Sequence, residues 1–394
     1  MSGSIKDRVA IVGMGCTRFG ELWNKSASDL VVEAAYEAFE DAGVEPKDIQ
    51  AGWVGASYDV SAKTGMGLTA PLRLQGVPVT RVENACATGI DAFRNACYAV
   101  AAGIYDLVLA LGVEKIKDMG FSGLGVGYYP GVSNTQPMLT APGAFAILAT
   151  RYFEKYGLSY EEGKRAIGAI SVKSHANGSL NPKAHFQNKI TLEQVINAPI
   201  IAEPLGLYDC CGVSDGAAAA IITRADMARN FRSDPVYVKA LQICVSADYG
   251  RISTKYDYTH IPETYLAGQR AYEEAGIKNP REEISMAEVH DCFSITELVT
   301  MEDLQFSPRG RAREDIESGF FNLDGGLPVQ PDGGLKCFGH PVGASGIRML
   351  YEMYLQLQGR AGKRQIKNPR LGLTHSLGGQ PGGCTISVCI VGLK

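Results

Sequence analysis

The sequence predicts a layered α/β protein made of two similar halves, the first of which carries an insertion. Short apolar strand segments alternate with amphipathic helical segments, and this alternation begins again after Pro235. Residues from about 115 to 204 interrupt it with loops and turns. We therefore assign a first half to residues 1–114 and 205–234, an inserted loop domain to 115–204, and a second half to 235–394. No flexible linker separates the halves, so we expect them to pack together.

The first half is predicted to open with a strand and a capped helix. Residues 9–13 form a short apolar run that ends in glycine, which is typical of a strand. Ser26 or Ser28 then caps a helix that ends at Gly43, because the apolar residues between them recur on one helical face. The later elements expected in this half are strands at 52–55, 107–112 and 216–222 and a helix from about 89 to 103.

The insertion is predicted to hold a Gly/Tyr/Pro loop at 123–131, a helical run through Arg151 and Tyr156, and then turns rich in Asn, His and Lys. Segments that break a regular alternation often carry binding residues. In the second half the pattern predicts strands at 236–241, 286–289 and 384–391 and helices at 264–275 and 347–357.

Composition excludes several classes of protein. Of the 394 residues, 45% are hydrophobic and 20% are charged, as in folded globular chains. The net charge is −4 and no run of Lys or Arg occurs, so we expect neither a nucleic-acid partner nor a basic membrane anchor. No apolar stretch reaches the ~18–20 residues of a membrane span, and the first residues do not resemble a signal peptide. Ten cysteines without a C-x-x-C pair indicate reduced thiols and a cytoplasmic protein, and we interpret the pair Cys210-Cys211 as structural.

Cys86 is the first candidate for chemistry. It lies among small residues just before the predicted alanine-rich helix. The start of a helix presents unpaired N–H groups and a partial positive charge, which we expect to lower the pKa of the thiol and favour a thiolate nucleophile. Taken alone, the residue also fits a small buried side chain without a catalytic role.

Two further segments carry histidines. His340 stands in a rigid Gly/Pro-rich turn, 339–346, before a predicted helix, and histidine is the side chain used most often as a general base. His290 and Cys292 directly follow a predicted strand, and the ends of strands are where α/β proteins place their sites. Each segment taken alone also fits a structural role.

A glycine-rich loop at 377–383 is predicted between two C-terminal strands. Such a loop can aim backbone N–H groups at a developing oxyanion, although a flexible hairpin fits as well. A dinucleotide site is excluded, because the fingerprint that begins at Gly13 and Gly15 would need a third glycine where Arg18 stands.

Together, these segments resemble the thiolase superfamily, and most closely its sterol-carrier-protein thiolase branch with archaeal and bacterial relatives. The resemblance covers essentially the whole chain and includes the segments 112–115 and 214–218. It implies a duplicated thiolase fold of five αβαβα layers that binds acyl-CoA through the inserted loop domain at 115–204. Coenzyme A is then a substrate, with no permanently bound cofactor. No catalytic metal is expected, because no His, Cys or Asp set has metal-ligand spacing.

The resemblance also implies roles for individual residues. Cys86 matches the nucleophile that accepts the acyl group, and His340 matches the histidine that activates it and helps to hold the thioester oxygen. His290 stands where other thiolases carry the asparagine of an Asn-Glu-Ala-Phe box, so it is expected to contribute to an oxyanion hole. Gly378 matches the residue whose N–H joins that of Cys86 in a second oxyanion hole.

One position departs from the usual pattern. Most thiolases carry an acid/base cysteine two residues before the glycine that Gly378 matches, and this chain has Ser376 there. In the branch with a His-Asp-Cys-Phe box, the cysteine of that box takes over the role. The resemblance therefore implies that Cys292, and not Ser376, moves the proton.

The function implied is that of an acyl-CoA C-acyltransferase, which cleaves a 3-ketoacyl-CoA with coenzyme A or runs the reverse Claisen condensation through an acyl-cysteine. Tyr128, Tyr129, Pro130, Met119 and Phe121 are candidates to line a pocket for a bulky or aromatic substrate such as an aroylsuccinyl-CoA. Surface aromatics are an equally good interpretation. Two alternatives stay open: a thiolase-fold retro-aldolase acting on branched CoA esters, and a non-catalytic scaffold subunit of a thiolase complex.

The resemblance also implies partners. Thiolases of this branch often work with a small separate protein that carries an OB-fold and a zinc ribbon. This chain has no C-x-x-C pair and no β-barrel pattern after its second half, so it does not supply that module. We expect a homodimer, with two copies of such a partner completing a heterotetramer.

Overall fold

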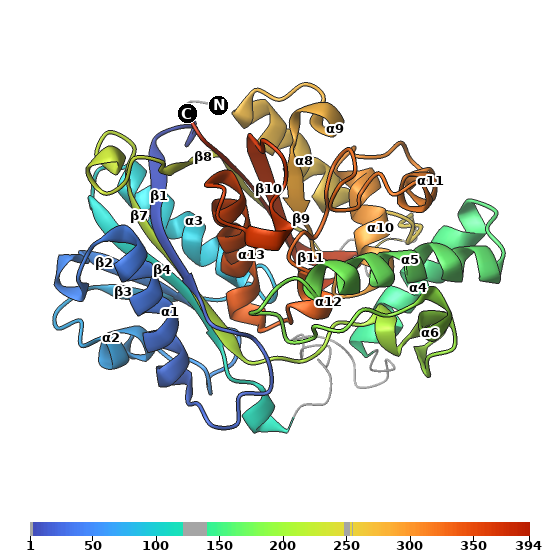
Figure 1. The fold of residues 1–394 in the computed structure, drawn as a ribbon, viewed down its shortest axis with the longest axis horizontal. Coiled ribbons are helices and arrows are strands. Elements are labelled where there is room, and N and C mark those ends of the chain that lie inside the picture. The colour runs from blue at the N-terminus through green and yellow to red at the C-terminus, as the bar shows by residue number, and fades with distance from the viewer. Residues whose placement is uncertain (1–2, 121–139, 248–252, 254) are drawn as a thin grey trace.

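The computed structural model describes residues 3–120, 140–247, 253 and 255–394, and a nine-stranded sheet forms their centre (Figure 1). Apolar runs form these strands, and β1, β4 and most of β7 are buried along their length. The strands are β1 Val9–Cys16, β2 Ala51–Gly55, β3 Val79–Val82, β4 Leu107–Glu114, β7 Gly216–Arg224, β8 Val236–Val245, β9 Met286–Glu288, β10 Leu371–Gln380 and β11 Gly383–Gly392.

The order of the strands reveals the duplication. Across the sheet it reads β3-β2-β4-β7-β1-β8-β11-β10-β9, so β1, β7, β4 and β2 in one half correspond to β8, β11, β10 and β9 in the other. In both halves the two inner pairs are antiparallel and the next pair is parallel. The halves join where β1 pairs antiparallel with β8, through Ala10 with Tyr237 and Ile11 with Val236. The predicted pair of similar α/β halves is confirmed.

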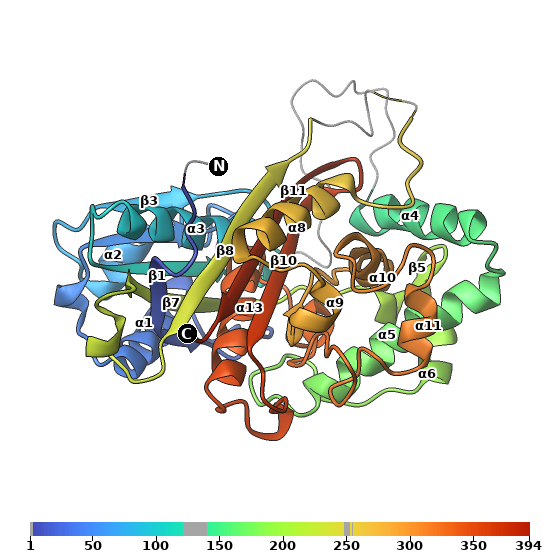
Figure 2. The same cartoon turned by 90° about the horizontal axis from the view of Figure 1, so that it is seen from above.

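Five helices complete the layers, namely α1 Ala27–Ala42, α2 Met66–Leu72, α3 Thr88–Ala101, α8 Pro262–Ala275 and α13 Val342–Leu357. Helix α1 packs on β1 and β7, and α8 packs on β8 and β11 (Figure 2). Helices α3 and α13 pack on each other, and α13 contacts strands of both halves. The predicted five-layered αβαβα arrangement follows from these contacts.

Helix α1 shows how local sequence sets its bounds. Ser26, rather than Ser28, is the N-cap, and its hydroxyl accepts a hydrogen bond from the N–H of Asp29 while the Asp29 carboxylate accepts one from the N–H of Ser26. Gly43 ends the helix with a left-handed φ of 67°, which glycine adopts without strain. The apolar face predicted for this helix is the buried one.

The insertion corrects one sequence prediction. It contains α4 Ala141–Lys155, α5 Tyr160–Gly178, α6 Leu192–Ile196 and a short hairpin of β5 Ile200–Ala202 and β6 Leu205–Gly206. Turns were predicted after Tyr156, and this was wrong for α5. That helix buries Lys164 and Lys173, which pair with Asp209 and Glu297, so its buried face is too polar to show an apolar period. The predicted loop at 123–131 lies outside the described residues.

The described residues of the second half form four additional helices, α9 Pro280–Glu283, α10 Ser294–Asp303, α11 Ala312–Glu317 and α12 Gly334–Cys337. None of the helices in the described part of the chain is long and apolar enough to cross a membrane.

Glycines let α3 and α13 approach the first-half strands and each other closely. A Cβ added at Gly112 of β4 would lie 2.1 Å from the carbonyl oxygen of Gly343, and one added at Gly89 would lie 2.8 Å from the same oxygen. Such distances exclude any side chain without movement of the backbone. The starts of α3 and α13 are therefore brought together inside the protein.

Candidate active site

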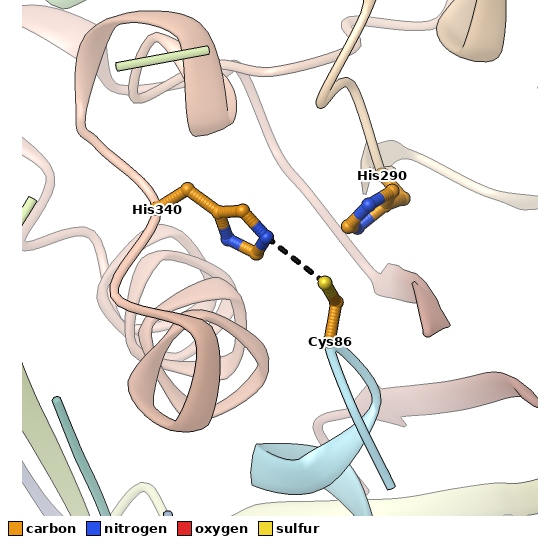
Figure 3. A group of neighbouring side chains, drawn as sticks. All are labelled: Cys86, His290 and His340. Atoms are coloured by element: carbon orange, nitrogen blue, oxygen red, sulfur yellow. Dashed lines mark hydrogen bonds between the residues drawn. The ribbon is translucent and has the colours of Figure 1, made fainter. Parts of the chain in front are cut away.

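The starts of α3 and α13 bring Cys86 and His340 into contact. Each residue lies two positions before the first residue of its helix, Thr88 or Val342. The Sγ of Cys86 lies 3.2 Å from Nε2 of His340 (Figure 3). The structure thus brings together two residues that are 254 positions apart in the sequence.

The hydrogen bonds around His340 define its neutral tautomer. The Ser345 hydroxyl donates its proton to the carbonyl of Pro341 at 2.9 Å and lies 2.8 Å from Nδ1 of His340. Because a hydroxyl has one proton to donate, Ser345 accepts from Nδ1–H. Nε2 then carries no proton in the neutral ring and accepts from the thiol of Cys86. His340 is therefore oriented as a general base toward Cys86.

The expected lowering of the Cys86 pKa is not what the structure shows. Burial, followed by the negative charges of Glu114 and Glu83, raises the pKa of the thiol to about 12, although backbone N–H groups of Cys86 and Gly379 act in the lowering direction. Burial also lowers the pKa of His340 to about 3. Removal of the thiol from water raises its pKa by more than the start of α3 lowers it. The resting pair is a neutral thiol and a neutral imidazole.

His290 reaches the same place from the segment after β9. Its ring centroid is 5.3 Å from that of His340 at an angle of 77°, and both rings lie close to the thiol (Figure 3). One nitrogen of each ring and the Cys86 sulfur lie within 4.8 Å of one another. Nδ1 of His290 is buried and has no hydrogen-bond partner within the described protein. Burial lowers the pKa of His290, so this ring is neutral as well.

Cys292 lies on the wall of the same cavity as His290. Its Sγ is 3.7 Å from Oγ1 of Thr296, and burial raises the pKa of its thiol. A thiol of raised pKa stays protonated at neutral pH and can donate a proton.

The glycine-rich loop predicted at 377–383 is a hairpin between β10 and β11. A Cβ added at Gly378 would lie 2.4 Å from the carbonyl oxygen of Asn84 and 3.0 Å from the nitrogen of Cys86, so only glycine fits there. The N–H group that acts on the Cys86 thiol from this hairpin is that of Gly379, one residue further on. The role of the Gly378 N–H stays a prediction.

Ser376 is buried away from this cavity. Its hydroxyl lies 3.7 Å from the sulfur of Met349, and it is not among the residues that line the cavity. This placement agrees with leaving Ser376 out of the proton transfers.

A cavity of about 610 Å³ contains the thiol and both histidines. All three parts of the chain line it, including Phe145 of α4 and His175 of α5 from the insertion. Sequence reasoning missed several of its lining residues, including Ser57, Tyr208 and Lys336.

Two other groups of residues singled out in the sequence can be compared with the lining of this cavity. The cysteines interpreted as structural, Cys210 and Cys211, line the cavity, and the N–H of Cys211 donates to the carbonyl of Cys292 at 2.8 Å. Met119 is 47% exposed and is not among the lining residues. The other four residues proposed for an acyl pocket, at 121 and 128–130, lie outside the described residues.

A thiol next to a correctly oriented base, with backbone donors beside the sulfur and a cavity around it, is the arrangement required for covalent catalysis by cysteine. Comparisons with known proteins agree. Two family models match, Thiolase, N-terminal domain over residues 9–226 and Thiolase C-terminal domain-like over residues 245–390. The chain belongs to the thiolase family.

Individual relatives place the chain within that family. The acetyl-CoA acetyltransferase of Methanothermobacter thermautotrophicus is 40% identical over 391 residues, which cover 96% of this chain and 98% of the relative. Sterol carrier protein 2 of Gallus gallus is 32% identical over 391 residues, or 94% of this chain and 70% of the relative. The predicted branch and the predicted class of enzyme, an acyltransferase, are confirmed.

A solved structure also resembles the chain closely. The Ltp2-ChsH2(DUF35) aldolase has a TM-score of 0.84 at 26% identity, over 99% of this chain and 98% of that one.

We predict that Ser345→Ala slows alkylation of Cys86 by iodoacetamide at pH 7 by about tenfold or more, because the His340 ring loses the acceptor that fixes its tautomer. Ser345→Thr, which keeps a hydroxyl, should react at close to the wild-type rate. Mass spectrometry of the labelled Cys86 peptide over time measures both rates. An unchanged rate in Ser345→Ala would contradict the role assigned to this hydroxyl.

We also predict that thiolysis survives exhaustive chelation. Cys86, His290 and His340 are close enough to hold a metal ion, but the resemblance to thiolases implies a role for each of them as a free side chain. Activity of the chelated enzyme is compared with that of the same preparation after addition of Zn²⁺, Mn²⁺ or Fe²⁺. Loss on chelation and recovery with a single metal would contradict the prediction.

Proposed function

We propose that this acyltransferase cleaves a 3-ketoacyl-CoA with coenzyme A, or catalyses the reverse Claisen condensation, through an acyl group carried on Cys86. The observation that supports it most directly is the contact between Cys86 and Nε2 of His340 inside the cavity. Coenzyme A takes part as a substrate, without a permanently bound cofactor, and binds along the insertion at 115–204.

In the first step, the sulfur of Cys86 attacks the 3-keto carbon of the substrate while its proton passes to Nε2 of His340. Both groups are neutral at rest, so the site contains no buried thiolate–imidazolium pair before the attack, and the proton is transferred as the sulfur attacks. The oxygen that becomes negative lies next to the sulfur, where the N–H groups of Cys86 and Gly379 act, with the Gly378 N–H as the second predicted donor. Removing one such donor from an enzyme costs roughly 3–4 kcal/mol of transition-state stabilisation.

In the second step, the bond between C2 and C3 breaks and an enolate of the shorter acyl-CoA leaves. His290 and the protonated His340 stabilise the enolate oxygen, because both rings lie beside Cys86. Cys292 gives its proton to the enolate carbon, and its raised pKa means that the thiol is protonated when the enolate forms. A second coenzyme A then gives its thiol proton to the Cys292 thiolate and attacks the acyl group on Cys86. The departing Cys86 thiolate takes back the proton held by Nε2 of His340, which restores the free enzyme.

The proposed substrate is bulky or aromatic, such as an aroylsuccinyl-CoA. The volume of about 610 Å³ and the side chains of Phe145, Phe293 and Tyr208 on the cavity wall support this. The alternative of a retro-aldolase acting on branched CoA esters is supported by the structural likeness to the Ltp2-ChsH2(DUF35) aldolase. The Cys86–His340 contact favours acyl transfer, and it also argues against a non-catalytic scaffold subunit.

The assembly proposed is a cytoplasmic homodimer that binds two copies of a small OB-fold and zinc-ribbon protein, as a heterotetramer. The support is the likeness to a solved aldolase whose description includes a second, DUF35 component.

We predict that Cys86→Ala abolishes thiolysis, that Cys292→Ala lowers kcat by about 10²-fold or more, and that Ser376→Ala stays within a few-fold of wild type. The reason is that Cys86 and Cys292 line the cavity whereas Ser376 does not. Release of products from a panel of 3-ketoacyl-CoA esters, varied in length and aromaticity, measures all three. A large loss in Ser376→Ala with Cys292→Ala near wild type would reverse the assignment of the acid.

We predict that the chain isolated from its native host carries a small zinc-containing protein in a 2:2 ratio. Size-exclusion chromatography with light scattering and zinc analysis of the complex would measure this. A homodimer that has full activity and no associated zinc protein would contradict the proposed assembly.

A further inference from the structure

Lys336 is a buried cation on the wall of the catalytic cavity that none of the proposed steps uses. It belongs to α12, four residues before His340, and only 2% of its surface is exposed. It lines the same cavity as Cys86, Cys292 and His340. Its positive charge acts on cavity-lining groups, since it lowers the pKa of the thiols of Cys210 and Cys211 against the effect of burial.

The other buried Lys and Arg side chains in the described part of the chain each have a carboxylate partner. This is what the cost of burying a charge requires. The pairs are Lys115–Asp215, Lys164–Asp209, Lys173–Glu297, Lys239–Asp7, Arg348–Glu288, Arg348–Asp332 and Arg364–Glu352. Lys336 differs from all of them, because within the described residues no carboxylate oxygen lies within 4.0 Å of its Nζ.

The nearby acids are occupied by other groups. Nζ of Lys336 donates one hydrogen bond, to the backbone carbonyl of Asp209 at 2.8 Å. The carboxylate of Asp209 is used by Lys164, by the N–H of Gly206 and by the hydroxyl of Ser294. The carboxylate of Asp291 accepts from the N–H groups of Leu335 and of Lys336 itself.

An ammonium group has three N–H donors, and acceptors among the described residues take one of those on Lys336. The described residues that line the cavity include aromatic rings and thiols, such as Phe145, Phe293 and Cys211, and one carboxylate, that of Glu83, which forms no ion pair with Lys336. The charge of Lys336 also acts on Asp291, lowering the pKa of that carboxyl against the effect of burial, but the two do not form an ion pair within 4.0 Å. An amide carbonyl of a bound CoA ester would accept a hydrogen bond but leave the charge uncompensated. A carboxylate on the substrate would satisfy both the free donors and the charge.

We propose that Lys336 binds a carboxylate on the acyl part of the substrate, and that this enzyme acts on CoA esters that carry a second, ionised carboxyl group. The inference rests on the proposed thiolase function, whose example substrate, an aroylsuccinyl-CoA, also carries a second carboxyl group, and it assigns the recognition of that group to Lys336. Lys336 thereby acts as a specificity-determining residue. The cost of its unpaired charge in the free enzyme is offset when an acidic substrate binds.

Binding of matched CoA esters tests the proposal without turnover. Succinyl-CoA and butyryl-CoA have four-carbon acyl chains and differ at the end, where one has a carboxylate and the other a methyl group. In full-length Cys86→Ala protein, calorimetry should show succinyl-CoA binding about tenfold more tightly or better. Adding Lys336→Met should reduce that ratio to about twofold or less. Equal affinities in Cys86→Ala, or a loss in Lys336→Met that is the same for both esters, would overturn the proposal.

A matched control uses another buried lysine. Lys173 pairs with Glu297 at 2.6 Å and does not line the cavity. Lys173→Met should lower the unfolding temperature and keep the succinyl/butyryl ratio, because it leaves Glu297 unpaired. Lys336→Met should unfold at or above the wild-type temperature, because it removes a charge that has no ion-pair partner. An unfolding temperature lower than that of Lys173→Met would identify Lys336 as a structural charge and overturn the proposal.

Turnover by the wild-type enzyme separates this inference from the proposed function. The substrates are 3-ketoadipyl-CoA and 3-ketohexanoyl-CoA, which again differ by a terminal carboxylate. A kcat/KM about tenfold or more higher for the acidic ester supports both ideas. Equal turnover of the two esters overturns the role of Lys336 and leaves the thiolase function standing. Tight binding of succinyl-CoA without any thiolysis overturns the thiolase function and leaves carboxylate binding by Lys336 standing.

Discussion

The close approach of α3 and α13 is the constraint on which the site depends. Backbone contacts between Gly89, Gly112 and Gly343 replace the side-chain layer that normally separates packed elements. Because the two helices start next to each other, residues just before each start meet in the interior. Cys86 and His340 stand at those positions, so their 3.2 Å contact follows from how two layers pack and not from any local turn.

A second set of interactions fixes the position of His290 relative to this pair. Arg348 of α13 forms ion pairs with Glu288 of β9 and with Asp332, all fully buried. The helix that presents His340 is thus attached to the strand that presents His290. Burial, which makes these ion pairs strong, also raises the pKa of Cys86 and lowers that of His340. Cys86, His290 and His340 are therefore held together without charge until a substrate arrives.

Much of the fold, and the residues that meet around Cys86, could be predicted from the sequence, because they depend on local patterns. The apolar face of α1, its caps and the strand runs are periodic signals, and Cys86, His290 and His340 stand in recognisable segments. Prediction failed for features that depend on which side chains are buried in the folded protein. Helix α5 was missed because its buried lysines depend on distant acids for their partners. The predicted direction of the pKa shift of Cys86 was wrong, because the sequence does not show how far folding removes the thiol from water.

The internal two-fold relation of the sheet has a consequence for how the site was built. Helices α3 and α13 occupy related places in the two halves, and each follows a segment that supplies one member of the reacting pair. Corresponding positions in the two halves thus carry different side chains, a thiol before α3 and an imidazole before α13. Neither half contains both Cys86 and His340, so the pair forms only because β1 and β8 join the two halves in one sheet.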